Sequence, residues 1–383
     1  MRRTIPDTLE PPPRLVPTRV NVLLLSSRFP WPCFTGDRLR AAIWLAALEK
    51  HSNVALVSPD GIVPRDAPHF RFHPAARSFR RAIAGALRGT PIHTLLAAPY
   101  DWAGAIERAQ QDLGDFDATI VLLSRLDPWV RPHLPRGLHV LDAIDSLRGS
   151  MLERAKEASP LTRWFWRAES RRVARAEQDA ISAYDRVVVV SATDSVELDA
   201  LAISNGVSIA PLHDTPRTFD FGFWGRLAYF ANADAASWLL DEIWPAIRAQ
   251  RPNATLIIAG ADAPARLRAA HGRDGIVVQS PVDDIAALAR RISVALFPVR
   301  YGTGQSNKVL EAAEAGCAIV ATQIAMRGLP ELERHTLIAN GAATFAAAAL
   351  DANPTKELRA IVETTYARQT TLDRLKTIVE AAA

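Results

Sequence analysis

The segment Tyr301–Thr322 contains the residue types that a ligand with phosphates and a ribose requires. Small and polar residues form its first part: Gly302, Thr303, Gly304, Gln305 and Ser306. An amide, an ammonium and a carboxylate follow within about one and a half helical turns: Asn307, Lys308 and Glu311. Free backbone N–H groups at a helix start bind anions, and residues four apart share a helix face. We interpret this set as a site for phosphates and a ribose diol.

The elements expected around this set form a strand–loop–helix–strand unit. Val294–Phe297 is an apolar run typical of a buried strand, and Cys317–Ala321 is a second one. Between them, Asn307–Ala315 is predicted to be a helix with Ser306 as its N-cap. The pattern also fits an ordinary βαβ unit in which Lys308 and Glu311 are merely solvated.

The order GQSNKVLEAAEAGCAIVAT resembles the donor-binding segment of GT-B glycosyltransferases, in the large retaining family of family four type that includes exopolysaccharide-type sugar transferases. The resemblance implies an α/β architecture of two Rossmann-like doubly wound domains facing a central cleft. It implies that Glu311 holds the ribose of a UDP- or GDP-linked sugar. It further implies that the enzyme uses no metal and no cofactor besides this nucleotide-sugar substrate.

The first strand and loop of the chain show a second resemblance to the same family. Val20–Leu25 is an apolar strand, and the following FPWPCFTGDRLR is similar to the family's opening loop. The resemblance assigns Gly36, Asp37 and Arg40 to the donor site. From the residues alone, Gly36 could merely make the turn, Asp37 is the expected N-cap of a helix reaching Lys50, and Arg40 could be solvated.

The segment Gly222–Asn232, GFWGRLAYFAN, resembles the family segment whose arginine meets the donor phosphates. We therefore expect Gly225 and Arg226 at the diphosphate, since a guanidinium forks onto phosphate oxygens. The alternative is a structural arginine after a strand. The lysine that often follows is missing, so Lys308 is expected to supply the second catalytic cation.

Two departures from the family pattern leave other functions open. Thr303 stands where the first of two paired glutamates would be, and the first-domain histidine has no clear match. The equivalent loop, LLSRLDP, presents Ser124 and Arg125 instead. A non-catalytic partner protein of this fold, or a nucleotide-sugar epimerase, therefore remains an alternative.

Length and composition indicate a globular protein of two domains. The chain has 383 residues, 49% hydrophobic and 22% charged, with a net charge of +4. We expect a leader at residues 1–18, an acceptor domain at 19–205, a donor domain at 206–345 and helices at 346–383 that pack back on the first domain. The turn ISNGV, Ile203–Val207, and the polar segment Pro211–Asp220 mark the boundary near Gly206.

The cysteines and the chain start favour a cytoplasmic protein, and the resemblance implies a role in bacterial polysaccharide biosynthesis. Cys33 and Cys317 lie in unlike contexts, and no secretion signal or membrane-spanning run is present. No cluster of His, Cys, Asp or Glu has metal-ligand spacing. We expect a glycan, a lipid-linked or a small-molecule acceptor, and no nucleic acid.

Two basic segments could contact the inner face of the cytoplasmic membrane. Arg77–Arg88 is an amphipathic pattern with four arginines, and Trp164–Arg175 combines aromatic residues with arginines inside a predicted helical region, Met151–Ala183. The alternative for the first segment is a surface helix docked on its own domain, and the alternative for the second is a solvated Glu–Arg face.

Asp142 and Asp145 lie just past the end of a predicted strand of the first domain. They could serve acid–base chemistry, although capping of the next helix is the preferred interpretation for Asp145.

Alternation of strands and helices continues in the second half. We expect strands at Phe219–Trp224, Ala254–Ala259 and Ile276–Val278, and a helix at Asp234–Gln250. The tail, Pro354–Ala383, is predicted to be helical.

Overall fold

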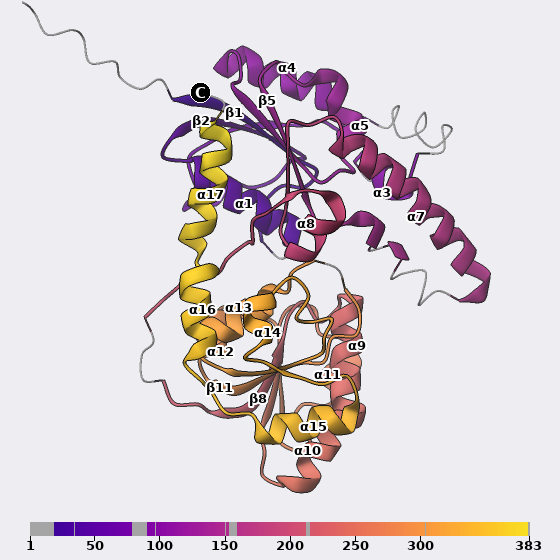
Figure 1. The fold of residues 1–383 in the computed structure, drawn as a ribbon, viewed down its shortest axis with the longest axis vertical. Coiled ribbons are helices and arrows are strands. Elements are labelled where there is room, and N and C mark those ends of the chain that lie inside the picture. Colours follow the sequence, from indigo (N-terminus) through magenta and orange to yellow (C-terminus); the bar gives the residue numbers. More distant parts are fainter. Residues whose placement is uncertain are drawn as a thin grey trace, which may run out of the picture.

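The computed structural model describes residues 19–33, 35–78, 90–95, 97–149, 151–152, 159–211, 215–302 and 304–381. Two α/β units lie one above the other in Figure 1, and the C-terminal helices run along one side of both. Each unit is built on a parallel sheet with helices on its two faces.

The first sheet has seven parallel strands, and its order reverses direction between β1 and β4. In spatial order they are β3 (Arg71–Pro74), β2 (Ser52–Ser58), β1 (Val20–Ser26), β4 (Ala118–Leu122), β5 (Leu138–Ile144), β6 (Arg186–Val189) and β7 (Leu201–Ala202). Its helices are α1 (Gly36–Leu48), α3 (Ile92–Leu95), α4 (Trp102–Leu113), α5 (Asp127–Val130), the 3₁₀ helix η1 (Arg131–His133), α7 (Pro160–Ile181) and α8 (Ala192–Leu198).

The second sheet has six parallel strands and reverses direction between β8 and β11. In spatial order they are β10 (Ile276–Gln279), β9 (Leu256–Ala259), β8 (Phe219–Trp224), β11 (Ile292–Phe297), β12 (Ala318–Ala321) and β13 (Leu337–Ile338). Its helices are α9 (Phe230–Trp238), the π turn η2 (Leu239–Ile243), α10 (Trp244–Gln250), α11 (Ala265–Arg268), α12 (Ile285–Ala289), α13 (Asn307–Glu314), α14 (Pro330–Glu333) and α15 (Ala342–Asp351).

The central strands are apolar because both faces of each sheet are covered. In β1, Leu24 belongs to the core on one face and Leu23 to the core on the other, and neither is exposed. Two doubly wound sheets were expected from the alternation of strands and helices, and the structure confirms this fold class. In open sheets of this kind, ligands bind outside the carboxyl ends of the strands at the point where the strand order reverses.

The tail returns to the first domain. Helix α16 (Glu357–Thr365) lies against α13, whereas α17 (Arg368–Glu380) lies against α1. Leu375 and Val379 are buried in the same apolar core as Val22 of β1. The first domain is therefore completed by residues from the other end of the chain.

Two predicted helix starts are wrong. Thr35, not Asp37, is the N-cap of α1, because the Asp37 carboxylate is taken up by Thr35 and by two arginines described below. The helix expected from Asp234 begins earlier, at Phe230, and is interrupted by the π turn.

Some elements of the fold were not predicted from the sequence. Edge strands β3, β7 and β13 were not anticipated, since they are short and only partly apolar. Most of the basic segment Arg77–Arg88 lies outside the described residues. Among those that are described, no helix has the length and apolar character needed to cross a membrane.

Candidate functional site

The predicted site residues of the second domain gather at the carboxyl ends of β8 and β11. Gly225 follows β8 and Gly302 lies shortly after β11, with φ values of 147° and 145° that favour glycine. Helix α13 then starts after Ser306, which is its N-cap by position but makes no side-chain capping hydrogen bond. Thr303 lies outside the described residues.

Glu311 is turned toward the sheet rather than into solvent. Its Oε2 accepts a hydrogen bond from Trp224 Nε1 at 2.8 Å. Burial raises the pKa of Glu311, while the Trp224 hydrogen bond and the positive charges of Lys308 and Arg368 oppose that rise. The interpretation of Glu311 as a merely solvated helix residue is therefore wrong.

Lys308 lies beside Gly225. Its ammonium donates to Asn232 Oδ1 and sits 5.1 Å from the centre of the Phe223 ring. Burial lowers its pKa to about 8, and the charge of Glu311 partly opposes this shift. A Cβ at Gly225 would lie only 2.9 Å from Asn232 Nδ2 and 3.4 Å from the Lys308 amine, so glycine is what allows this approach.

The backbone of Arg226 lies near Lys308, because both contact Asn232, but the guanidinium of Arg226 binds a different residue. Its carbonyl accepts from Asn232 Nδ2 at 2.9 Å, whereas its Nε donates to Asp262 Oδ2 at 2.8 Å. Both partners of this ion pair are about half exposed, 50% and 54%. Convergence of Arg226 and Lys308 on one phosphate group stays a prediction, and it requires Arg226 to leave Asp262.

The first domain presents a cluster of charges opposite this site. Asp37 accepts from Arg125 Nη2 at 3.0 Å and lies 3.3 Å from Arg28. Arg125 also donates to Ser27, and burial lowers its pKa, partly countered by Asp37. The loop with Ser124 and Arg125 thus meets the loop after β1. A Cβ added to Gly36 would have no atom within 4 Å, so this position is open.

Arg40 is not solvated. Its Nε donates to Asp142 Oδ2 at 2.6 Å, and Trp44 Nε1 donates to the same oxygen at 2.7 Å. Its Nη1 reaches Asn205 Oδ1 at 3.3 Å, in the segment that leads to the second domain. Asp142 is thereby occupied by structural contacts.

The glycine loop, residues 301–306, lies directly against the first domain. A Cβ on Gly304 would be 3.3 Å from the Cβ of Asp145. Gln305 accepts from Ser204 and donates to the carbonyl of Gly328. At the start of α13, Asn307 accepts from Asn205 Nδ2 at 3.4 Å. The loop therefore bridges the two domains.

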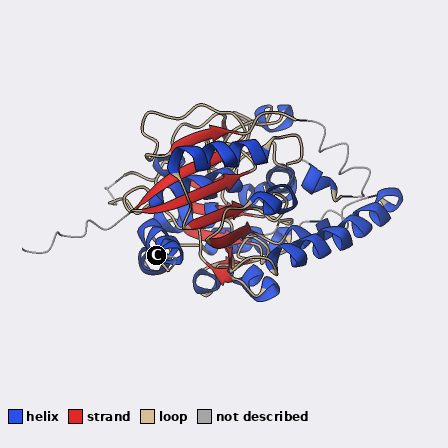
Figure 2. Ribbon diagram, turned by 90° about the horizontal axis from the view of Figure 1, so that it is seen from above, coloured by secondary structure: helices blue, strands red, loops and turns tan. Residues whose placement is uncertain are grey.

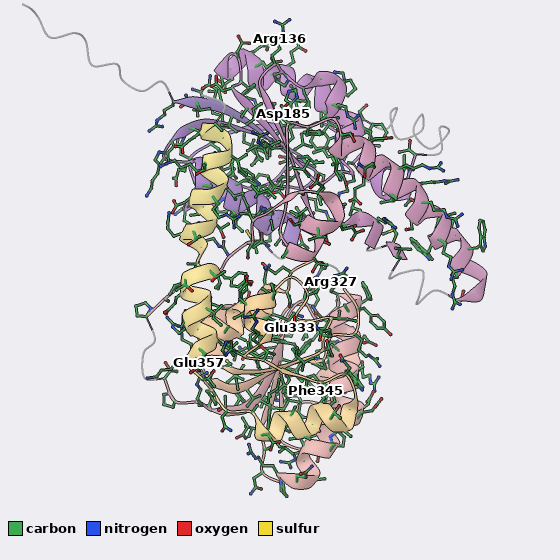
Figure 3. All side chains as sticks on the ribbon, in the orientation of Figure 1. Arg136, Asp185, Arg327, Glu333, Phe345 and Glu357 are labelled. Atoms are coloured by element: carbon green, nitrogen blue, oxygen red, sulfur yellow. The ribbon has the colours of Figure 1, made fainter. Side chains whose placement is uncertain are left out.

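Beside the glycine loop, a cavity of about 510 Å³ opens between α8 and the segment 323–333. Residues of both domains line it: Ala192, Thr193, Gln323, Ile324, Met326, Arg327, Gly328, Pro330 and Glu333. Figure 3 shows Arg327 where the two domains meet and Glu333 deeper in the second domain. Within the described part of the chain, no three His, Cys, Asp or Glu side chains are grouped to hold a metal ion.

Several residues of the site were not named from the sequence. Trp224 and Asn232 lie inside the segment that resembled the phosphate-binding region, so the motif could have indicated them. Asp262 and Arg368 gave no local signal, because each is brought in from a distant element.

Comparisons with known proteins agree with this architecture. Residues 218–352 match the family described as glycosyl transferases group 1. The structure is similar to a sucrose-phosphate synthase from Thermosynechococcus elongatus, with a TM-score of 0.70, 14% identity and coverage of 95% of this chain and 99% of the other. It is also similar to HepE from Anabaena in complex with UDP, with a TM-score of 0.63, 15% identity and coverage of 94% and 100%.

A third similar structure is WaaG, a glycosyltransferase involved in lipopolysaccharide biosynthesis, with a TM-score of 0.58, 15% identity and coverage of 93% and 99%. No curated protein matches the sequence. At these identities the similarity establishes the fold. The chain thus has the GT-B fold, and residues 218–352 of its second half match the family of glycosyl transferases group 1.

Proposed function

We propose that the protein transfers a sugar, with retention and without a metal ion, from a UDP- or GDP-linked donor to an acceptor hydroxyl. The observation that carries the proposal is the placement of Glu311 on Trp224, with Lys308 beside Gly225, at the reversal point of the second sheet. A carboxylate there suits a ribose diol, and an ammonium there suits a phosphate. HepE, whose structures contain UDP and UDP-glucose, supports a nucleotide-sugar as the donor class.

The two cations act on the leaving diphosphate. As the bond from the sugar to the diphosphate breaks, negative charge grows on the leaving oxygens, and Arg226 and Lys308 stabilise it. The same charges contribute less to binding of the intact donor, so they act mainly on kcat. Gly225, Gly302 and Gly304 let the backbone approach the phosphates.

The acceptor is a glycan, a lipid-linked sugar or a small molecule, and the protein works in the cytoplasm or at the inner face of its membrane. Helix α7 supports the membrane contact. Glu169 and Glu177 on α7 are buried, while four arginines of the same helix are exposed: Arg167, Arg171, Arg172 and Arg175. We further propose an acceptor domain at residues 19–205 and a donor domain at 206–345.

Calorimetric titration with UDP and GDP, combined with hydrolysis of radiolabelled donors, tests the function. We expect micromolar-range binding of one nucleotide and slow donor hydrolysis that persists in EDTA. Loss of activity in EDTA with recovery on adding Mn²⁺ would show that a metal neutralises the diphosphate.

A non-catalytic partner protein is the second candidate, because the Asp262 carboxylate holds Arg226. Such a protein would bind the nucleotide and leave the donor intact. An epimerase would instead interconvert the donor sugars.

A further inference from the structure

A further arginine lies where the tail crosses from the second domain to the first. The backbone N–H of Arg368 donates to the carbonyl of Val207 at 2.8 Å, and its Nη2 donates to the carbonyl of Gly206 at 3.0 Å. A Cβ on Gly206 would lie 2.6 Å from Thr371 Oγ1 and 3.1 Å from the Cα of Arg368. The two crossing segments are therefore in close contact, and Arg368 has a fixed position.

The surroundings of Arg368 combine groups from three elements. Burial lowers its pKa, and the positive charge of Arg40 on α1 lowers it further. Cys33, in the loop after β1, and Glu311, on α13, act in the opposite direction. The Gly206 carbonyl that Arg368 binds follows Asn205 in the chain. Asn205 accepts from Arg40 Nη1 at 3.3 Å and donates to Asn307, at the start of α13, at 3.4 Å. Arg368 therefore lies close to α1 and to the helix that contains Glu311.

Neither guanidinium is satisfied in this arrangement. Arg40 Nη2 and Arg368 Nε are buried and have no hydrogen-bond acceptor among the described residues. Of the Arg40 nitrogen atoms, only Nε donates to Asp142, and the oxygen that accepts it also accepts from Trp44 Nε1. A buried N–H of a charged group without an acceptor costs free energy, and two like charges side by side add to that cost. An anion lodged against them would relieve both.

We propose that Arg368 is a ligand of the donor diphosphate, carried into the site by the C-terminal tail. This inference rests on the proposed function, because it takes Glu311 as the ribose ligand. The phosphates are joined to the ribose through its 5′ carbon, so they lie near the ribose that Glu311 would hold. Arg368 acts electrostatically on Glu311 and on Cys33 of the loop after β1.

The charge count of the site supports this assignment. The second domain lacks the lysine after Arg226, and Lys308 is held by Asn232 and countered by Glu311. Arg368 supplies a positive charge from outside the domain.

The structural alternative is that Arg368 only fastens the tail to Gly206. Arg374 provides the matched control, since it lies on the same helix and its Nη2 donates to the carbonyl of Ala202 at 2.8 Å. Arg368→Gln and Arg374→Gln each remove one hydrogen bond from the tail to the same connecting segment. Only the first removes a charge near Glu311.

The experiment is a titration of the full-length wild type and both variants with UDP, GDP, their nucleosides and inorganic pyrophosphate. We expect Arg368→Gln to weaken nucleoside diphosphate and pyrophosphate binding by about tenfold to a hundredfold, with nucleoside binding unchanged. Arg374→Gln should leave all three unchanged. Arg368→Lys should retain part of the affinity, because an ammonium keeps the charge but not the forked geometry.

The possible failures are distinguishable. Equal affinity of wild type and Arg368→Gln for the diphosphate would overturn the role of Arg368 and leave the donor function standing. An equal loss for nucleoside and diphosphate, or the same loss in Arg374→Gln, would show a fastening role only. Wild-type binding of pyrophosphate alone, abolished in Arg368→Gln, would keep the anion site and refute the nucleotide donor. Binding of none of these ligands by wild type would refute both.

Discussion

Glu311 connects three elements of the proposed donor site, because it lies on α13, accepts from Trp224 of β8 and interacts with Arg368 of the tail. We expect Glu311→Ala to weaken nucleotide binding by about 1.5–3 kcal/mol, the range for a hydrogen bond to a charged group. The helix should persist, since alanine is a better helix former than glutamate. Glu311→Gln is the control, as it keeps an acceptor for Trp224. Unchanged affinity in a folded Glu311→Ala protein would show that the carboxylate does not hold the ribose.

Arg226 must exchange its acidic partner for a phosphate if it acts in catalysis. We expect Arg226→Ala to lower kcat by on the order of a hundredfold, with a smaller effect on nucleotide binding. Arg226→Lys should recover only part of the rate, because it cannot fork onto two oxygens. Asp262→Asn should keep or raise the rate, since it releases the guanidinium. Wild-type kcat in Arg226→Ala would contradict the assignment.

Lys308 gives the site a pH dependence. Burial lowers its pKa to about 8, so the amine of the free protein loses its proton as the pH rises through that value. A bound diphosphate favours the charged form, and we therefore expect affinity to fall as the pH rises from about 7 to about 9.5. The phosphates of the nucleotide keep their charge over this range, because the phosphate pKa is about 6. Titrations at several pH values check this, and Lys308→Gln should bind weakly with no such slope.

At the scale of elements, α7 differs most from what its sequence suggested. Its glutamates and arginines recur at helical spacing, yet Glu169 and Glu177 face the protein, and the outward face is basic. Trp164 near its start is 69% exposed, and Figure 2 shows the helix extending away from the body. A basic face with an exposed tryptophan suits an anionic membrane surface.

We predict that the protein sediments with anionic liposomes at low salt and is released as salt rises, because the attraction is electrostatic. The double variant Arg171→Glu and Arg175→Glu should lose this binding. The same change in charge at Arg273 and Arg334, two exposed arginines of the second domain, is the control. Equal sedimentation of all three proteins would exclude α7 as the contact.

At the scale of the whole molecule, the tail joins two domains into one folding unit. Leu375 of α17 is fully buried against residues of β1 and α1. We expect Leu375→Ala to lower the free energy of unfolding by about 2–5 kcal/mol, as for other large-to-small changes in a core. Urea unfolding followed by tryptophan fluorescence measures it.

The neighbouring Lys376→Ala is the control for this prediction. Lys376 makes a surface ion pair with Glu380, so its loss should cost no more than about 0.5 kcal/mol. Equal stability of the two variants would mean that the tail is not part of the first domain's core.

The central strands and the second-domain part of the proposed site follow from local patterns in the sequence. Val20–Leu25 and Val294–Phe297 are apolar throughout because strands covered on both faces need no polar residues, and this pattern is local. The group from Gly302 to Glu311 is also local, since one loop and one helix turn position all of it. For the same reason Ser306 was placed correctly as the last residue before α13.

The hydrogen-bond and ion-pair partners of the charged side chains follow only from the tertiary structure. Asp37 has the residue type of an N-cap, but Arg125 lies 88 positions away and draws its carboxylate out of that role. Arg226 was assigned to phosphate, but its Nε donates to the distant Asp262. Arg368 acts electrostatically on Glu311 only because the tail packs back on the first domain. Partners of this kind are fixed by the burial of apolar surfaces elsewhere, and a local pattern carries no record of them.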